Sequence, residues 1–218
     1  MENLTPQNNL PCIVIGAGGH AKVVISALKA TNQEVLFITD KDKSLSGTKI
    51  LGVPVVQDDE CIFSHSPKKV RLYLGVGTST SCFHRKTIWN KFLHSGYSAG
   101  IVIHPSAAVS EDVKIDHGSQ IMAHATIQPG CHIKAFSIIN TGAQIDHDCT
   151  IEAFSHIGPG AILCGQVKIN EAAFIGAGAT IIPSISIGSK SVIGAGSAVI
   201  HDIPASTKVG GNPAKVLR

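Results

Sequence analysis

Isoleucine or a close substitute recurs every six residues, without a break, through the second half of the chain. The series is Ile103, Val109, Ile115, Ile121, Ile127, Ile133, Ile139, Ile145, Ile151, Ile157, Leu163, Ile169, Ile175, Ile181, Ile187, Ile193 and Val199. A helix buries residues at spacings of about 3.6 and a strand at spacings of about 2, so a sustained period of six indicates a repeat architecture.

A small side chain stands four positions after many of these residues, for example at Ala107, Ala125, Cys131, Ala143, Cys149, Ser155 and Ala173. One large and one small inward residue in each hexad fit a narrow core. Three hexads make a triangular coil of about 18 residues, and neighbouring coils pair in parallel. Cys131 and Cys149 are one such coil apart, which predicts stacked core side chains rather than ligands. The period leaves the hand of winding open, since parallel crossovers are normally right-handed.

The first half of the chain follows a different pattern. The stretch CIVIGAGGHAKVVISALKA predicts a strand, a glycine loop and a helix. Further strands are expected in EVLFITD, which ends at Asp40, and in RLYLGVG, which ends at Gly77. Ser79 or Thr80 can then cap another helix. The apolar face of that helix would hold Phe83, Ile88, Trp89, Phe92 and Leu93. Strands that alternate with helices predict a parallel α/β domain.

Length and composition agree with a folded, two-part chain. With 218 residues, 44% of them hydrophobic and 15% charged, the chain can bury a full core. We expect a flexible N-terminus over residues 1–10, the α/β domain over residues 11–100 and the repeat domain over residues 101–218. A net charge of +3 gives no reason to expect a nucleic-acid partner.

The location and redox state are expected to be those of a cytoplasmic protein. No apolar run approaches the roughly 18 residues needed to cross a bilayer, and the N-terminus lacks the order of a signal peptide. The six cysteines contain no C-x-x-C pair, so we expect them to be reduced.

The GAGGH loop is a candidate phosphate site. Gly16, Gly18 and Gly19 would let the backbone turn at positive φ and approach a ligand, and the following helix N-terminus favours an anion. The loop is not a complete dinucleotide fingerprint, because His20 precedes the position where a third glycine is expected. An ordinary strand-to-helix turn explains this short motif equally well.

The stretch NTGAQIDHDCT carries the candidate chemistry. An imidazole with a carboxylate partner is a suitable general base, which can remove a proton from an attacking nucleophile. His147 lies between Asp146 and Asp148, two positions after the inward Ile145, and is expected to face outward at a coil corner. Taken alone, the D-H-D sequence is more typical of an exposed turn.

Several segments together resemble a known family. The hexads, with IGPGAI, IGAGAT and the ending GNPAKVLR, resemble the left-handed β-helix acyltransferases of the hexapeptide-repeat superfamily. IGAGGHAKVV followed by INTGAQIDHDCTIEAFSHIGPGA is similar to a narrower group within it. That group contains bacterial UDP- and GDP-4-amino-sugar N-acetyltransferases and sialic-acid O-acetyltransferase-like proteins. The resemblance implies a Rossmann-like N-terminal domain with a parallel sheet, followed by a left-handed parallel β-helix.

The resemblance also implies substrate-binding residues in the first half. The glycine loop would bind the nucleotide, the end of the second strand would contact base and ribose, and the loop after RLYLGVG would contribute a further contact. The matching residues are Gly16, Gly18, Gly19, His20, Asp40, Lys41 and Gly77. Relatives often have Asn after the last glycine, where this chain has Thr78, and this departure leaves the nucleotide and the sugar undefined.

For the second half, the resemblance implies catalysis with acetyl-CoA and no metal. The family places its general base at His147 and the orienting acid at Asp148, with Asp146 as the alternative. Related active-site groups fall on Asn140 and His156. The coenzyme would be contacted by His156, Gly165, Gly211 and Lys215. Relatives are homotrimers whose active sites lie between neighbouring β-helices.

The implied activity is N-acetylation of the 4-amino group of a UDP- or GDP-linked sugar for bacterial surface glycans. O-acetylation of sialic acid or a related sugar would use the same hexads and the same base. A zinc enzyme of the γ-carbonic-anhydrase kind would need an H-x4-H pair, which the second half of the sequence lacks. A non-catalytic sugar-nucleotide-binding protein is a further alternative, since a fold does not establish a function.

Overall fold

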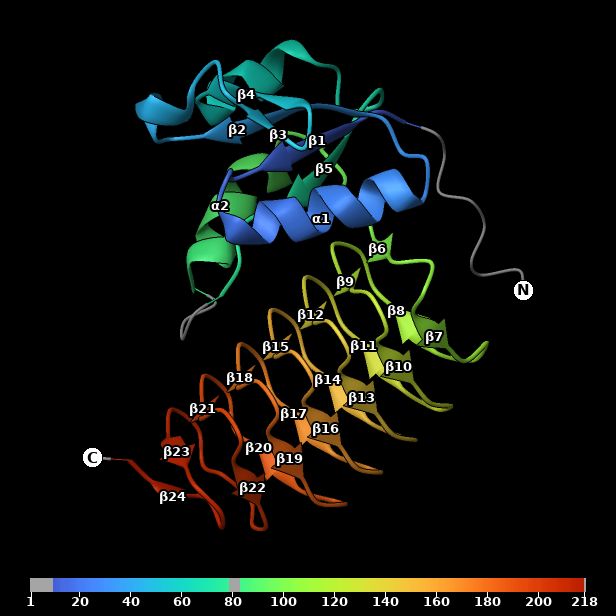
Figure 1. The fold of residues 1–218 in the computed structure, drawn as a ribbon, viewed down its shortest axis with the longest axis vertical. Helices are drawn as coiled ribbons and strands as arrows, with labels where there is room; N and C mark the ends of the chain where they lie inside the picture. Colours follow the sequence, from blue (N-terminus) through green and yellow to red (C-terminus); the bar gives the residue numbers. More distant parts are fainter. Residues whose placement is uncertain (1–9, 79–82, 218) are drawn as a thin grey trace.

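The computed structural model describes residues 10–78 and 83–217, which form an α/β unit followed by a parallel β-helix (Figure 1). Most of the N-terminal segment expected to be flexible lies outside the described residues, as do the proposed helix caps Ser79 and Thr80 and the side chain of Phe83. Within the described residues, no helix is both long and apolar enough to cross a membrane.

The α/β unit is built on a five-stranded sheet of order β3-β4-β2-β1-β5. Its strands are β1 (Cys12–Ile15), β2 (Val35–Asp40), β3 (Lys49–Ile50), β4 (Val53–Gln57) and β5 (Arg71–Leu74). The pairs β1/β2, β1/β5 and β2/β4 are parallel, and only β3 runs antiparallel to its neighbour. The helices are α1 (Gly19–Ala30) and α2 (Phe83–Leu93), with short 3-10 segments η1 (Lys43–Leu45) and η2 (Asp59–Ser64).

The central strand β1 separates two cores. Because side chains alternate along a strand, Cys12 and Val14 pack with α1, while Ile13 and Ile15 pack on the opposite face with α2. The buried face of α2 contains the predicted Ile88, Trp89 and Phe92. The prediction for Leu93 is wrong, since this last helical residue is 52% exposed at the edge of that face.

The β-helix consists of short strands that pair one coil apart. Ile127 pairs with Ile145, and Ile145 with Leu163, so the register advances by 18 residues as the hexads predict. Sheet I is formed by β6 (Val102–Ile103), β9 (Gln120–Ile121), β12 (Ile138–Ile139), β15 (His156–Ile157), β18 (Phe174–Ile175), β21 (Val192–Ile193), β23 (Lys208–Gly210) and β24 (Lys215–Val216).

Two further sheets complete the triangular coil. Sheet II is formed by β7 (Ala108–Val109), β10 (Thr126–Ile127), β13 (Gln144–Ile145), β16 (Ile162–Leu163), β19 (Thr180–Ile181) and β22 (Ala198–Val199). Sheet III is formed by β8 (Lys114–Ile115), β11 (His132–Ile133), β14 (Thr150–Ile151), β17 (Lys168–Ile169) and β20 (Ser186–Ile187). The inward isoleucines and the stacked Cys131 and Cys149 belong to one buried core, as predicted.

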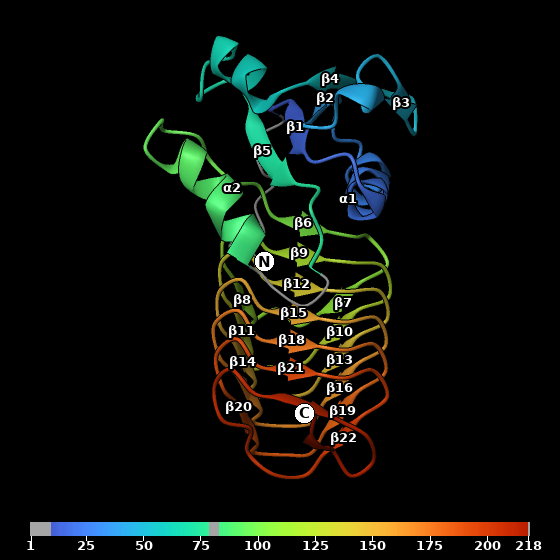
Figure 2. The same ribbon diagram turned by 90° about the vertical axis from the view of Figure 1, so that its left-hand side faces the viewer.

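The α/β unit packs on sheet I and on the two corners that flank it. Helix α1 contacts β6, and Met122 at corner I–II joins the core of α1. At corner III–I, the Trp89 ring of α2 lies 4.8 Å from that of Phe136, which stacks on Phe154 at 4.9 Å. The loops of corner II–III, between sheets II and III, lie on the side of the β-helix away from the α/β unit (Figures 1 and 2).

Candidate active site

His147 lies at corner II–III, between β13 and β14, where the structure pairs its ring with one of its two acidic neighbours. Nδ1 of His147 lies 2.9 Å from Oδ2 of Asp148. Asp146 does not contact the ring in this way, because its Oδ1 accepts a hydrogen bond of 2.8 Å from the backbone N–H of His147. The carboxylate is an acceptor only, so Nδ1 carries the proton and Nε2 is the free basic nitrogen.

The surroundings of His147 favour its charged form. The hydrogen bond that Nδ1 donates to Asp148 raises the pKa of the imidazole, and the negative charges of Asp146 and Asp148 act in the same direction, while desolvation opposes them. The side chain remains 55% exposed. This imidazole can therefore accept a proton from a group that approaches from outside the β-helix.

Two glycines make room for this pair. A Cβ at Gly165, one coil after His147, would lie 2.5 Å from Nε2 of the imidazole. A Cβ at Gly130, one coil before Asp148, would lie 2.3 Å from Oδ1 of its carboxylate. Within the described part of the chain, the Gly165 N–H donates to no other group. The Gly165 amide therefore lies on the residue next to the free nitrogen of His147. This amide is a suitable hydrogen-bond donor for an oxyanion.

Asn140 and His156 form a second pair on another side of the coil. The Asn140 amide nitrogen lies 3.1 Å from Nε2 of His156 on β15, and Oδ1 of Asn140 accepts from the N–H of Thr141 at 2.8 Å. His156 is 6% exposed. Burial lowers its pKa to about 3, and the positive charge of Arg85 adds to the effect. This histidine is neutral, and within one chain it lies on sheet I, away from the corner that carries His147.

The glycine loop between β1 and α1 is only partly as predicted. Gly16 has φ +95°, and a Cβ there would lie 2.4 Å from Val76 Cγ2. Positive φ at Gly18 and Gly19 was a wrong expectation, because Gly18 is the extended N-cap of α1, with φ −75°, and Gly19 is its first helical residue. A Cβ at either glycine would meet nothing within 4 Å. Gly18 and Gly19 therefore border open space at the N-terminus of α1, where no side chain caps the helix. Phosphate binding uses the free N–H groups of such a helix end.

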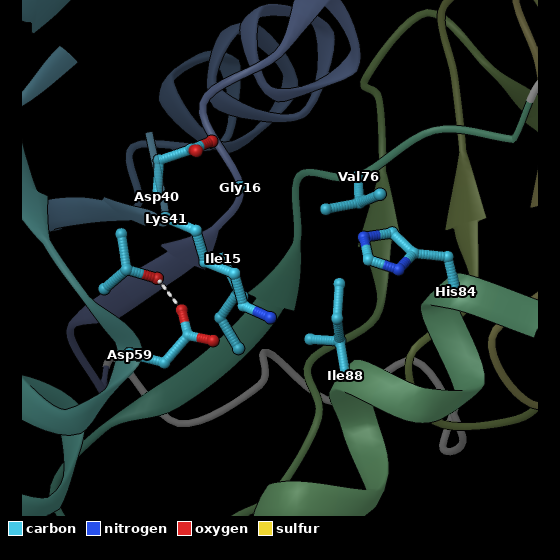
Figure 3. Close-up of a pocket in the computed structure, with 9 residues that line it drawn as sticks. Ile15, Gly16, Asp40, Lys41, Asp59, Val76, His84 and Ile88 are labelled. Carbon is cyan, nitrogen blue, oxygen red and sulfur yellow. Dashed lines mark hydrogen bonds between the residues drawn. The ribbon is translucent and has the colours of Figure 1, made fainter. Parts of the chain in front are cut away.

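Asp40 fixes the backbone around a hollow at the carboxyl edge of the sheet (Figure 3). Its Oδ2 accepts from the N–H of Ala17 at 2.6 Å, and its Oδ1 accepts from the N–H of Asp42 at 2.9 Å. Asp40, Lys41 and Gly16 line the hollow, which has a volume of about 110 Å³. Ligands bind outside the carboxyl ends of strands in such open α/β sheets.

The comparisons with known proteins agree on both halves. Residues 12–92 match the family described as the PglD N-terminal domain, and residues 166–200 match the hexapeptide repeat of succinyl-transferase. Comparison with curated protein sequences gave no match. The structure of PerB from Caulobacter crescentus, in complex with CoA and GDP-perosamine, is similar with a TM-score of 0.88 and 39% identity, over 95% of this chain and 97% of that one.

A second solved structure extends the similarity. The acetyltransferase domain of PglB from Neisseria gonorrhoeae, in complex with acetyl coenzyme A, gives a TM-score of 0.89 and 36% identity, over 96% of this chain and 100% of that one. The chain belongs to the hexapeptide-repeat sugar acetyltransferases. Its β-helix is left-handed, as the resemblance implied.

Two predicted substrate contacts of this acetyltransferase lie at the junction of its halves. Nε2 of His20 donates to Oε1 of Gln120 on β9 at 2.7 Å, and the Gln120 amide donates to the Leu74 carbonyl at 2.8 Å. Burial lowers the pKa of His20 to about 4, and the charge of Arg85 acts in the same direction. A Cβ at Gly77 would lie 3.1 Å from Cβ of His20. His20 and Gly77 are therefore neighbours, and His20 joins the α/β unit to the β-helix.

The predicted coenzyme contacts near the C-terminus also lie on sheet I. Gly211 follows β23 with φ +95°, and the exposed Lys215 begins β24. Within one chain these residues do not lie at the corner of His147 and Gly165. Among the described residues of the acetyltransferase, no group of three or more His, Cys, Asp or Glu side chains is arranged to hold a metal ion.

Sequence reasoning missed three side chains. Asp59 and His84 line the hollow with Asp40 and Lys41. Arg85 is 1% exposed, and its guanidinium donates to the carbonyls of Val76 and Phe136, which lie in different halves of the chain. Asp59 follows a strand and could have been noticed for that reason, whereas the two α2 residues show no local signal.

Proposed function

We propose that the chain is an acetyl-CoA-dependent N-acetyltransferase that acetylates the 4-amino group of a UDP- or GDP-linked amino-deoxy sugar, for bacterial surface glycans. The observation that carries the proposal is the His147 imidazole, held through Nδ1 by Asp148, with Nε2 free beside the side-chain-free Gly165. The relatives support the reaction class, since PerB has been solved with CoA and GDP-perosamine and PglB with acetyl coenzyme A.

The proposed chemistry is a direct transfer. The sugar nitrogen attacks the acetyl carbonyl carbon while Nε2 of His147 takes a proton from that nitrogen. Asp148 stabilises the imidazolium that forms, and the Gly165 N–H donates to the carbonyl oxygen as it becomes negative. The C–S bond then breaks, and the coenzyme leaves with the proton as a free thiol. No covalent enzyme intermediate is involved.

The active site is proposed to form between subunits of a homotrimer. The α/β unit packs on sheet I, whereas His147 stands at corner II–III on the far side of the same coil (Figure 2). A nucleotide sugar held by one subunit would therefore meet the His147 of another. Asn140 and His156, which lie on the sheet I side, would approach the site from the subunit that holds the nucleotide.

The remaining residues receive roles on the same scheme. The N–H groups around Gly18 and Gly19 bind the diphosphate, and Asp40 and Lys41 lie where the base and ribose would bind. His20 and Gly77 shape the junction next to this site. His156, Gly165, Gly211 and Lys215 contact the coenzyme, and Asp146 holds the backbone of His147. We place the reaction in the cytoplasm, where acetyl-CoA is available, and we propose that residues 11–100 and 101–218 act as the two functional domains.

A thiol-release screen tests the proposal. Acetyl-CoA is offered with UDP- and GDP-linked 4-amino sugars and, separately, with free and activated sialic acids. Release of coenzyme A thiol with a nucleotide 4-amino sugar, and an amide in the product by mass spectrometry, is the expected result. An ester product formed from a sialic acid would instead establish O-acetylation, and no thiol release with any acceptor would favour a non-catalytic binding protein.

A further inference from the structure

The hollow at the carboxyl edge of the sheet has the features of a site for a flat ring. Ile15, Val76 and Ile88 give it apolar walls, and polar side chains stand at its rim (Figure 3). Small-molecule sites typically combine apolar walls with a few placed polar groups. The polar groups at this rim therefore decide which ring is accepted.

Asp59 is a buried acceptor on one wall of the hollow. The residue is 4% exposed, its Oδ1 accepts from Thr39 Oγ1 at 2.7 Å, and its Oδ2 lies 3.3 Å from Nζ of Lys91. Figure 3 shows the oxygen that does not bind Thr39 directed toward the space between Lys41 and Ile88. An ionised carboxylate has about four lone-pair sites. After these two contacts, Asp59 retains capacity for two further donors.

Donors stand across from this carboxylate. Lys41 follows β2 and His84 lies on the first turns of α2, and both are exposed side chains that line the hollow. Figure 3 shows the His84 ring on the opposite side of the hollow from Asp59. A ligand ring held between them would meet an acceptor on one edge and donors on another.

We propose that this hollow binds guanine and that Asp59 selects it, so that the substrate is a GDP-linked sugar. The N1–H and the 2-amino group of guanine are adjacent donors that one carboxylate can accept together, while O6 and N7 are acceptors for Lys41 or His84. Uracil presents a single N–H between two carbonyl oxygens, which a carboxylate repels. This inference rests on the proposed function for the nucleotide and names its base.

A purely structural role for Asp59 makes a different prediction. Through Thr39 and Lys91, the carboxylate also links β2, η2 and α2. If Asp59 only holds these elements together, its replacement should lower the affinity for every nucleotide by the same factor. A residue that binds the base changes the ratio between nucleotides that differ in one donor.

Calorimetric titration of the full chain with GDP, IDP and UDP separates the two roles. IDP lacks only the 2-amino group of GDP, so the wild type should bind GDP at least about tenfold more tightly than IDP, and UDP more weakly still. In Asp59→Asn, the ratio of GDP to IDP affinity should fall to within about threefold, because the amide NH2 no longer accepts.

The matched control is Glu60→Gln, which removes the same charge from the exposed neighbouring residue. It should keep the wild-type ratio of GDP to IDP affinity. Equal affinity of the wild type for GDP and IDP, tighter binding of UDP, or an equal loss for all three nucleotides in Asp59→Asn would overturn the proposal.

The thiol-release assay distinguishes a failure of the guanine assignment from a failure of the proposed function. Acetyl transfer to a UDP-linked but not to a GDP-linked 4-amino sugar would overturn the guanine assignment and leave the acetyltransferase proposal standing. Selective binding of GDP, lost in Asp59→Asn, without acetyl transfer to any sugar would support the guanine site and count against the proposed reaction.

Discussion

At the residue scale, the proposed chemistry depends on one imidazole and on what lies on each side of its ring. Asp148 engages Nδ1, and a Cβ at Gly165 would collide with Nε2. The two histidines with strongly lowered pKa, His20 and His156, are buried and already hydrogen-bonded through Nε2. Of these three histidines, His147 alone combines exposure with a raised pKa, which suits a proton acceptor.

Replacement of His147 by Ala should abolish general-base catalysis. We expect kcat for acetyl transfer to fall by roughly 10²–10⁴-fold, since that is the range that a positioned base contributes. Steady-state thiol release measures this change, and thermal unfolding checks that the fold is kept. The matched control is His94→Ala, an exposed histidine just beyond α2, which should leave kcat unaltered. Unchanged turnover in a folded His147→Ala protein would remove His147 from the mechanism.

Replacement of Asp148 by Asn should move the pH profile of kcat/KM. The base must be unprotonated, so activity is lost as the pH falls through the pKa of His147. Asp148 raises that pKa through its hydrogen bond, so its replacement lowers the pKa and the acidic limb should shift to lower pH. We also expect a smaller loss of turnover than in His147→Ala. If Asp146→Asn shifts the limb and Asp148→Asn does not, the carboxylate partner has been misassigned.

At the element scale, each hexad contains an inward position that the core requires and outward positions that the core does not constrain. From β6 to β23, the second residue of each β-helix strand points inward, whereas corner II–III residues such as Asp146, His147 and Asp148 are exposed and adopt the backbone conformation that the turn needs. Asp148, for example, has φ +58°, a conformation that Asp tolerates better than most residues. The corner can therefore carry a catalytic sequence at no cost to the stacked core.

The inward positions should dominate stability. Ile145 is 1% exposed in the β-helix core, so Ile145→Ala should lower the free energy of unfolding by about 2–5 kcal/mol. Its neighbour on the same strand, Gln144, is exposed, and Gln144→Ala should change that free energy by less than about 0.5 kcal/mol. Denaturant unfolding of the two variants measures the difference. Equal effects would contradict the inward register of this coil.

The elements also show how far sequence reasoning reaches. A period of six specifies which side chains point inward, and it predicts the 18-residue register that the paired strands have. In the α/β unit, the GAGGH sequence does not specify which glycine takes a positive φ, because Gly16, Gly18 and Gly19 differ only through their packing. Nor could the sequence place Asp59 and His84 at one hollow, since residues of β1, β2, η2 and α2 meet there only after the sheet has formed.

At the scale of the whole molecule, the arrangement of the α/β unit and the β-helix decides how the proposed active site can be assembled. The α/β unit is fixed to sheet I by His20 and Gln120 and to corner III–I by Trp89 and Phe136. These contacts hold the α/β unit on the side of the β-helix away from the loop between β13 and β14, the loop that carries His147 (Figure 1). The proposed reaction therefore requires a second subunit, and this requirement can be tested without a structure of the assembly.

Two inactive variants should restore activity when they are assembled together. His147→Ala removes the base and keeps the nucleotide half, whereas Gly18→Asp keeps the base. A Cβ at Gly18 meets nothing within 4 Å, and Asp is a favourable helix N-cap, so the second variant should fold while its charge repels the diphosphate.

Each variant alone should be inactive in thiol release. Equal amounts of the two variants are unfolded and refolded together, so that they mix at random in trimers. Roughly a quarter of the sites should then be intact, each formed by one subunit of each variant. Mixing the folded proteins without exchange is the control and should give none. If each chain used its own His147, the refolded mixture would stay as inactive as its components, because no single chain would contain both an intact base and an intact nucleotide site.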